Sequence, residues 1–222
     1  MIAMILAAGR GERMMPLTEN TPKPLIKVKG ITLIEHSINA LKKAGIIDIV
    51  INIAYLGEQI KTHLGDGSKF GINITYSDES LGVLETAGGI IKALPLLGDK
   101  PFIVINSDVL CDYNLSQLTL PIGALAHLVL IDNPAHNSNG DFSLINTHQV
   151  ITASRKSFTF SGFGIYHPDF FKNHLNVQGK LPLYPLLKEA LASNQLSGEH
   201  YQGYWQDIGT PERLELANNP KN

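Results

Sequence analysis

Short apolar runs alternate with amphipathic segments through the first half of the chain, and this alternation constrains the fold more than any other feature. Residues 2–6 form a continuous apolar run that ends in glycine, the pattern of a strand buried on both faces. In residues 32–44 apolar side chains recur with helical spacing, and Gly45 closes the segment. This alternation predicts a mostly parallel sheet with right-handed crossovers. The other elements expected in this half are strands at 46–53, 73–76 and 102–106 and helices at 56–64 and 88–97.

The second half is richer in predicted strands, which are separated by polar turns. We therefore expect one α/β domain over residues 1–222, with a Rossmann-like, mostly parallel mixed sheet flanked by helices. Ligands of open α/β sheets bind at the carboxyl ends of the strands, which makes the segments after the first and fourth strands the candidate binding sites. The elements expected here are strands at 124–131, 142–145, 150–152 and 160–166, a helix at 184–194 and a closing segment at 201–217.

Composition excludes several classes of function. The chain has 18 Lys and Arg against 20 Asp and Glu, so it has no broad basic surface for nucleic acid or anionic membranes. Any anion must instead be bound by a few placed residues. The single cysteine, Cys111, precludes an internal disulfide and is typical of a reducing compartment. The apolar start lacks the positive region of a signal peptide, so we expect a cytoplasmic protein without a membrane or nucleic-acid partner.

A glycine-rich segment directly follows the first predicted strand. Its small residues let backbone N–H groups approach a polyphosphate, and Arg13 adds a fork-shaped cation. Lys23 follows between Pro22 and Pro24, which stiffen the backbone that carries its ammonium group. The alternative is an ordinary glycine turn beside surface cations. The segment is not a Walker loop, because the Gly-Lys-Ser/Thr ending is absent, and it is not a dinucleotide fingerprint, because Met14 stands at the third glycine position.

Two aspartates from distant parts of the chain are candidate metal ligands. Asp108 comes just after the fourth predicted strand, and Asp207 precedes a helix that Thr210 and Pro211 open. Each also has a local alternative, because an aspartate after a strand or before a helix commonly serves a turn or a cap. Mg²⁺ is usually held by one or two carboxylates, with phosphates and waters in its other positions. Two aspartates meeting over a phosphate loop would satisfy that requirement.

The run LAAGRGERMMPLTENTPKPLIKVKG closely resembles the signature of the sugar-1-phosphate nucleotidyltransferases, also called sugar-nucleotide pyrophosphorylases. The resemblance implies a GT-A-like nucleotidyltransferase fold whose phosphate loop wraps the nucleotide. It also implies that Arg13 and Lys23 are catalytic, with Lys23 bridging the nucleotide α-phosphate and the sugar phosphate. Asp108 and Asp207 match the positions of the family's Mg²⁺ ligands. The sequence departs from the signature at Met15, where the family usually has a second arginine.

Later segments match other parts of the family's site. Residues 84–89 resemble the segment beside the nucleotide base, with Glu85 in place of the usual glycine. Residues 139–142 and 160–164 align with segments that lie near the sugar. Residues 154–156, Ser-Arg-Lys, stand where many relatives have a glutamate between those two segments.

The resemblance implies a nucleotide-binding half, residues 1–122, and a sugar-binding half, residues 123–222. The nucleotide-binding residues that it implies are Leu6, Ala7, Ala8, Gly9, Gly11, Glu12, Arg13, Lys23, Glu85, Thr86 and Gly88. The sugar-binding residues that it implies are Asn106, Asp108, Asn139, Gly140, Ser161 and Gly162.

The segments at 84–86, 139–142 and 159–162 are most similar to one subgroup, the N-acetylmuramate α-1-phosphate uridylyltransferases of bacterial cell-wall recycling. The resemblance implies transfer of a uridylyl group from UTP to a sugar 1-phosphate, with Mg²⁺ as cofactor and pyrophosphate as product. Mannose-1-phosphate guanylyltransferase and glucose-1-phosphate nucleotidyltransferase stay open as alternatives. A nucleotide-sugar sensor or regulatory subunit is the alternative outside the enzymes. We expect a monomer or a small homo-oligomer.

Overall fold

One sheet runs through the part of the chain that the computed structural model describes, residues 1–82, 84–145, 149–152 and 157–219. Its nine strands are β1 (Ile2–Leu6), β4 (Asp48–Ile53), β5 (Asn73–Asp78), β6 (Phe102–Asn106), β8 (Ala126–Ile131), β9 (Phe142–Ile145), β10 (Gln149–Thr152), β11 (Thr159–Tyr166) and β12 (Leu196–Tyr201). Two small ladders lie outside this sheet: β2 (Lys27–Val28) with β3 (Ile31–Thr32), and β7 (Val109–Cys111) with β13 (Trp205–Asp207). Residues 154–156, which the sequence singled out, lie outside the described residues.

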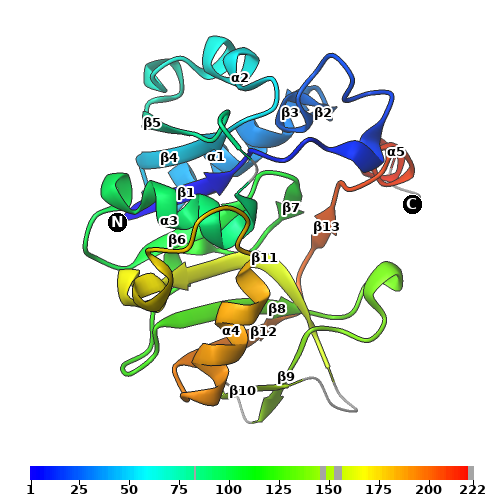
Figure 1. Ribbon diagram of the computed structural model, residues 1–222. Coiled ribbons are helices and arrows are strands. Elements are labelled where there is room, and N and C mark those ends of the chain that lie inside the picture. The colour runs from blue at the N-terminus through cyan, green and yellow to red at the C-terminus, as the bar shows by residue number, and fades with distance from the viewer. Residues whose placement is uncertain (83, 146–148, 153–156, 220–222) are drawn as a thin grey trace.

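The sheet is mixed, and its parallel part is formed by the first half of the chain. The strand order is β5-β4-β1-β6-β11-β8-β12-β10-β9, as Figure 1 shows. The first four strands in this order pair in parallel, β11 runs antiparallel to both β6 and β8, and β12 is parallel to β8. The predicted α/β class with a mostly parallel mixed sheet is therefore confirmed. The two halves of the sequence share the sheet, because β11 pairs directly with β6.

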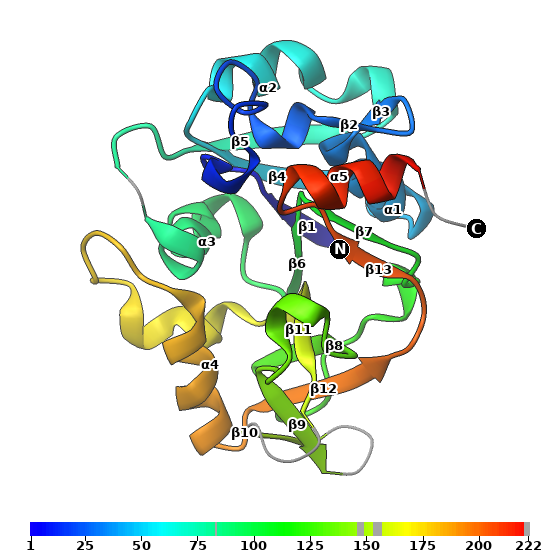
Figure 2. The ribbon, with the colours of Figure 1, turned by 90° about the vertical axis from the view of Figure 1, so that its right-hand side faces the viewer.

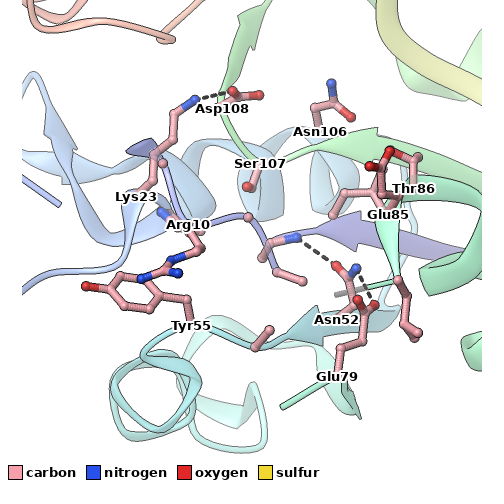
Figure 3. A pocket seen from close by; sticks show the side chains of 18 of the residues that line it. Arg10, Lys23, Asn52, Tyr55, Glu79, Glu85, Thr86, Asn106, Ser107 and Asp108 are labelled. Atoms are coloured by element: carbon pink, nitrogen blue, oxygen red, sulfur yellow. Dashed lines mark hydrogen bonds and ion pairs between the residues drawn. The ribbon is translucent and has the colours of Figure 1, made fainter. Parts of the chain in front are cut away.

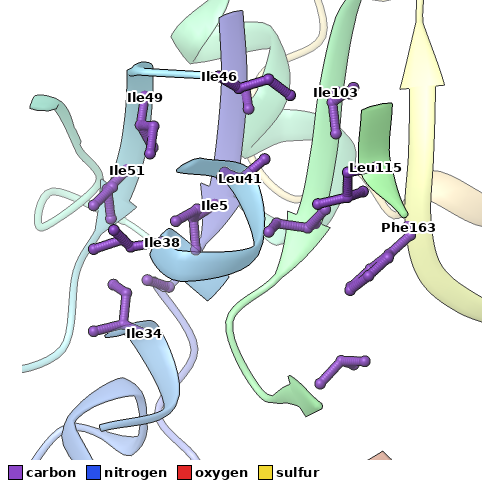
Figure 4. Close-up of a cluster of buried hydrophobic side chains, with 14 of the residues drawn as sticks. Ile5, Ile34, Ile38, Leu41, Ile46, Ile49, Ile51, Ile103, Leu115 and Phe163 are labelled. Atoms are coloured by element: carbon purple, nitrogen blue, oxygen red, sulfur yellow. The ribbon is translucent and has the colours of Figure 1, made fainter. Parts of the chain in front are cut away.

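Helices cover both faces of the sheet. The helices are α1 (Leu33–Lys43), α2 (Gly57–Leu64), α3 (Glu85–Leu97), α4 (Leu183–Ala192) and α5 (Pro211–Asn218). Alternate residues of β1 divide between two buried clusters. Ala3 and Ile5 pack with side chains of α1 and α2, while Met4 packs with side chains of α3 and α4. Figure 2 shows α3 and α4 on one side of the sheet and α1 on the other, and Figure 4 shows the α1 side of the core.

Local sequence signals define the ends of several helices. The Thr32 hydroxyl accepts a hydrogen bond from the Glu35 backbone N–H, while the Glu35 carboxylate accepts one from the Thr32 N–H. This capping box fixes the start of α1 at Leu33, one residue after the start of the predicted segment. The predicted start of α3 at Gly88 was wrong, because the helix begins at Glu85.

Strand β12 was not predicted from the sequence. Its residues, LSGEHY, carry little of the β-branched and apolar pattern that marks a strand. It forms because it pairs in parallel with β8, every residue of which is buried, so tertiary pairing overrides a weak local preference. No helix among the described residues combines the length and the apolar character needed to cross a membrane.

Candidate active site

A cavity of about 1070 Å³ lies where the parallel strands end at their carboxyl edge. The registers align Leu6 with Asn52 of β4 and with Asn106 of β6, so residues that follow these strands meet at one place. This is the position at which open α/β sheets bind ligands. Twelve of the residues predicted to bind the nucleotide, the sugar or the metal line the cavity: Leu6, Ala7, Ala8, Gly9, Gly11, Glu12, Arg13, Lys23, Glu85, Thr86, Asn106 and Asp108.

The glycine-rich loop folds directly onto Lys23. Gly11 has a φ of 66°, and a Cβ atom there would lie 2.9 Å from the Cβ of Lys23, so this position requires glycine. The Thr18 hydroxyl donates to the Gly11 carbonyl oxygen at 2.9 Å, which closes the loop. Lys23 begins a short 3₁₀ turn and is flanked by the buried Pro22 and Pro24. The lysine is thereby held against the loop, as the two prolines predict.

Lys23 forms an ion pair with Asp108 at one end of the cavity (Figure 3). The Nζ atom of Lys23 contacts Oδ2 of Asp108, and both side chains are largely buried, at 13% and 25% exposure. Salt screens the attraction between such partly buried charges less than it screens an exposed ion pair. In this state the lysine and the carboxylate neutralise each other.

Further cations line the same cavity, two from the loop and one from the segment before α4. The side chains of Arg10, Arg13 and Lys180 line the cavity, and the Arg10 guanidinium lies 5.2 Å from the centre of the Tyr55 ring. Met15, which replaces the family's second arginine, is 45% exposed and is not among the lining residues. Cations other than the missing arginine are therefore available to a polyphosphate at this loop.

The β7–β13 ladder places Asp207 on a segment beside that of Asp108. Asp207 pairs with Val109, and the Ile208 N–H donates to the Asp108 carbonyl oxygen at 2.8 Å, so the two aspartates lie on neighbouring segments. Asp207 lines a second cavity, of about 290 Å³, and not the main one, and its Oδ2 forms an ion pair with Arg213. The sequence did not identify Arg213. Each predicted metal ligand thus has a cation beside it.

The two aspartates are suitable ligands for Mg²⁺. Their carboxylate oxygens are the hard donors that Mg²⁺ prefers, and a site completed by substrate phosphates needs no more than two of them. Among the described residues there is no group of three or more His, Cys, Asp or Glu side chains that could hold a metal ion. A metal here would therefore depend on the phosphates of a substrate.

The predicted base-binding segment lies only partly in the cavity. Glu85 and Thr86 line it, and Glu85 has a φ of 60°, the left-handed backbone at which the family's usual glycine is unstrained. Gly88 does not line it, and the N–H groups of Ala87 and Gly88 both donate to the Leu181 carbonyl oxygen, at 3.0 and 3.1 Å. The first turn of α3 therefore offers fewer free N–H groups to an anion than its sequence suggests.

The predicted sugar residues separate into two groups. Gly162 touches Asn106, because a Cβ atom on Gly162 would lie 2.5 Å from the Asn106 side chain, and Ser161 precedes it in β11. The Ser161 carbonyl oxygen accepts a hydrogen bond from the Trp205 ring N–H at 2.9 Å, which ties this strand to β13. Asn139 and Gly140 lie in the loop before β9, and neither they nor Ser161 and Gly162 line the main cavity. Their assignment to the sugar stays a prediction.

Sequence reasoning missed a buried polar pair at the far end of the cavity. Asn52 accepts a hydrogen bond from the Ala7 backbone N–H at 2.7 Å and donates one to Glu79 Oε1 at 2.7 Å. Both side chains line the cavity, although each residue is only 4% exposed (Figure 3). The sequence feature that could have identified this pair is a polar residue near the end of each apolar run. Burial raises the pKa of Glu79, and the hydrogen bond from Asn52 partly opposes this rise.

Comparison with known proteins agrees with the geometry of this site. A sequence model of the nucleotidyl transferase family matches residues 2–221, and the chain belongs to this family. It is 49% identical to an N-acetylmuramate α-1-phosphate uridylyltransferase of Neisseria meningitidis serogroup B, over 98% of this chain and 96% of that protein. It is 32% identical to a mannose-1-phosphate guanyltransferase of Hypocrea jecorina, over 96% of this chain and 62% of that protein.

A solved structure supports the fold independently. The structure, described as a glucose-1-phosphate thymidylyltransferase from Bacillus anthracis in complex with sucrose, superposes with a TM-score of 0.86 at 23% identity. The superposition covers 100% of this chain and 97% of that one. The predicted nucleotidyltransferase fold and the predicted family are therefore confirmed, and the chain is a member of an enzyme family that transfers nucleotidyl groups.

The buried carboxyl group of Glu79 predicts a pH-dependent difference in stability. Its pKa is higher in the folded protein than the ordinary 4.5, so its favourable contribution is complete below 4.5 and is lost as the pH rises through the folded pKa. Glu79→Gln does not titrate. We expect this variant to gain free energy of unfolding relative to the wild type as the pH rises from 4.5 to 8. Urea unfolding at both pH values measures the change, and a difference that does not vary with pH contradicts the assignment.

Proposed function

We propose that the protein transfers the uridylyl group of UTP to N-acetylmuramate α-1-phosphate, forming the UDP-sugar and pyrophosphate. The observation that carries this proposal is the 49% identity to the N-acetylmuramate α-1-phosphate uridylyltransferase of Neisseria meningitidis, which extends over nearly all of both chains. A second relative with the same name, from Caulobacter vibrioides, is 30% identical over 95% of this chain. The cavity at the carboxyl edge of the sheet, with the Lys23–Asp108 ion pair in its wall, supports the same reaction.

The proposed chemistry is a direct displacement at phosphorus. An oxygen of the sugar phosphate attacks the α-phosphorus of UTP, and the bond from that phosphorus to the bridging oxygen of the β-phosphate breaks as pyrophosphate leaves. The attacking oxygen is already ionised at neutral pH, so no general base is required. The barrier comes from bringing two polyanions together, and positioning with charge neutralisation lowers it.

Each cation of the loop has a separate task in this proposal. Lys23 leaves Asp108 and bridges the α-phosphate and the sugar phosphate, which is a net exchange of one anionic partner for another. Arg13 holds the β- and γ-phosphates that become pyrophosphate. Once Lys23 has moved, the oxygens of Asp108 are available to a metal ion, and Asp207 lies on the neighbouring strand.

We propose Mg²⁺ as the cofactor, held by Asp108 and Asp207. When bound, Mg²⁺ would neutralise charge on the phosphates. The nucleotide would lie along the predicted nucleotide-binding residues of the loop, and the sugar beside Asn106 and residues Ser161 and Gly162 of β11. The same proposal gives the protein a cytoplasmic role in cell-wall recycling.

Mannose-1-phosphate guanylyltransferase is the second candidate, because a relative with that activity in its name is 32% identical over 96% of this chain. Assays of each nucleoside triphosphate with each sugar 1-phosphate separate the two candidate functions. We expect kcat/KM for UTP with N-acetylmuramate α-1-phosphate to exceed that for GTP with mannose 1-phosphate by at least ~100-fold. Pyrophosphate release measures both. A preference for the GTP pair contradicts the proposal, and no turnover with Mg²⁺ and any pair indicates a sensor or regulatory subunit.

Lys23→Met and Asp108→Asn test the proposed roles of the two residues. We expect each to lower kcat/KM for pyrophosphate release by ~100- to 1000-fold, because each removes a charge that the transition state requires. Lys27→Met is the matched control, since Lys27 is exposed on β2 and does not line the cavity. Its kcat/KM should stay within about 2-fold of the wild type, as for other exposed substitutions. Near-normal rates in the Lys23 and Asp108 variants, with unchanged thermal unfolding, contradict these roles.

A further inference from the structure

Arg10 lies on the side of the cavity where the proposed function places the phosphates. It directly precedes Gly11, whose backbone packs so closely on Lys23 that a Cβ atom there would lie 2.9 Å from the Lys23 Cβ. The side chain of Arg10 lines the cavity, and Figure 3 shows it on the same side as Lys23 and away from Asn52. Arg10 therefore adds a positive charge to the phosphate end of the cavity.

The Tyr55 ring is a fixed support for the Arg10 guanidinium. The guanidinium carbon lies over this ring, 5.2 Å from its centre. The Tyr55 hydroxyl donates to the Glu19 carbonyl oxygen at 2.7 Å. Four residues further on, in α2, the Gln59 side chain donates to the Asn20 carbonyl oxygen at 3.0 Å. These two hydrogen bonds fasten the start of α2 to the segment that follows the loop, so the ring keeps its place beside Arg10.

The N–H groups of the Arg10 guanidinium are available to a ligand. In the part of the chain that the structure describes, this side chain forms neither a hydrogen bond nor an ion pair, whereas Lys23 is paired with Asp108. A cation over the face of an aromatic ring is attracted to the ring without using its N–H donors. Arg10 can therefore bind an anion at once, while Lys23 has first to leave Asp108.

The loop has lost a cation at another position. Met15 stands where the family usually has a second arginine, and its side chain does not line the cavity. Arg10 and Arg13 are the two arginines of the loop that line it. A guanidinium presents its donors as a fork that matches two phosphate oxygens, so both residues are suited to a polyphosphate.

We propose that Arg10, together with Arg13, binds the terminal phosphates of the nucleoside triphosphate and so offsets the missing cation at residue 15. This inference rests on the proposed function, in which those phosphates leave as pyrophosphate. When the bond from the α-phosphorus to the bridging oxygen breaks, that oxygen takes the electron pair, and negative charge grows on the leaving pyrophosphate. A guanidinium at this place stabilises that charge.

Arg10→Met tests this role, because it removes the charge from an exposed side chain that the core does not need. We expect the dissociation constants of UTP and of inorganic pyrophosphate to rise by about 10- to 100-fold, since a charge-assisted contact is lost. The dissociation constant of UMP, which lacks the terminal phosphates, should stay within about 2-fold of the wild type. Unchanged binding of UMP also shows that the site is still folded.

Calorimetric titration of each ligand into the protein with Mg²⁺, without a sugar phosphate, measures these constants. Lys27→Met is the matched control, because it removes one positive charge from an exposed site that does not line the cavity. All three of its constants should stay within about 2-fold of the wild type.

Two results would overturn the inference. If Arg10→Met leaves UTP binding unchanged, or weakens UMP as much as UTP, Arg10 does not bind the terminal phosphates. The proposed function then stands as long as the wild type joins UTP to N-acetylmuramate α-1-phosphate. If the wild type binds neither UTP nor pyrophosphate, both the inference and the proposed function are wrong.

Discussion

The shared register of four parallel strands is the constraint on which the site depends. Because β5, β4, β1 and β6 run in the same direction, their carboxyl ends form one edge, and the register aligns Leu6 with both Asn52 and Asn106. The glycine loop, the Asn52–Glu79 pair and Asp108 all follow from that alignment. A shift of one residue in β1 would reverse which of its side chains face each cluster of the core, so packing on both faces of the sheet enforces the geometry of the site.

Charge is the second constraint, and it is balanced locally. The chain has a net charge of −2, yet a nucleotidyl transfer requires two polyanions to meet. Two of the cations that could offset the charge of these polyanions are held in ion pairs, Lys23 with Asp108 and Arg213 with Asp207. Paired in this way, the cations and the carboxylates are less costly to hold in a partly buried site than any of them would be alone. A polyphosphate can then replace a carboxylate as the partner of a cation, and a metal ion on the released carboxylates would offset part of the negative charge that the polyphosphate adds.

Local patterns predicted the parallel half of the fold well, because β1 is a continuous apolar run and α1 has apolar residues at helical spacing. Lys23 and Asp108 were also identified, since each stands beside a recognisable strand or loop. The β7–β13 ladder, β12 and Arg213 were not predicted, because they depend on pairing between distant segments of weak strand preference. Asn52 and Glu79 were missed for a different reason. A polar residue at the end of an apolar run looks like the start of an exposed turn, and only the fold shows that both side chains are buried.

The central claim is that the edge of the sheet is a nucleotide site in which Lys23 exchanges Asp108 for phosphate. A crystal structure of the protein with UTP and Mg²⁺ tests it most directly. The account predicts the triphosphate along the loop at residues 7–13, the Lys23 Nζ atom on a phosphate oxygen, and Asp108 released to the metal. A triphosphate bound outside this cavity, or a Lys23–Asp108 pair that persists with the nucleotide bound, would contradict it.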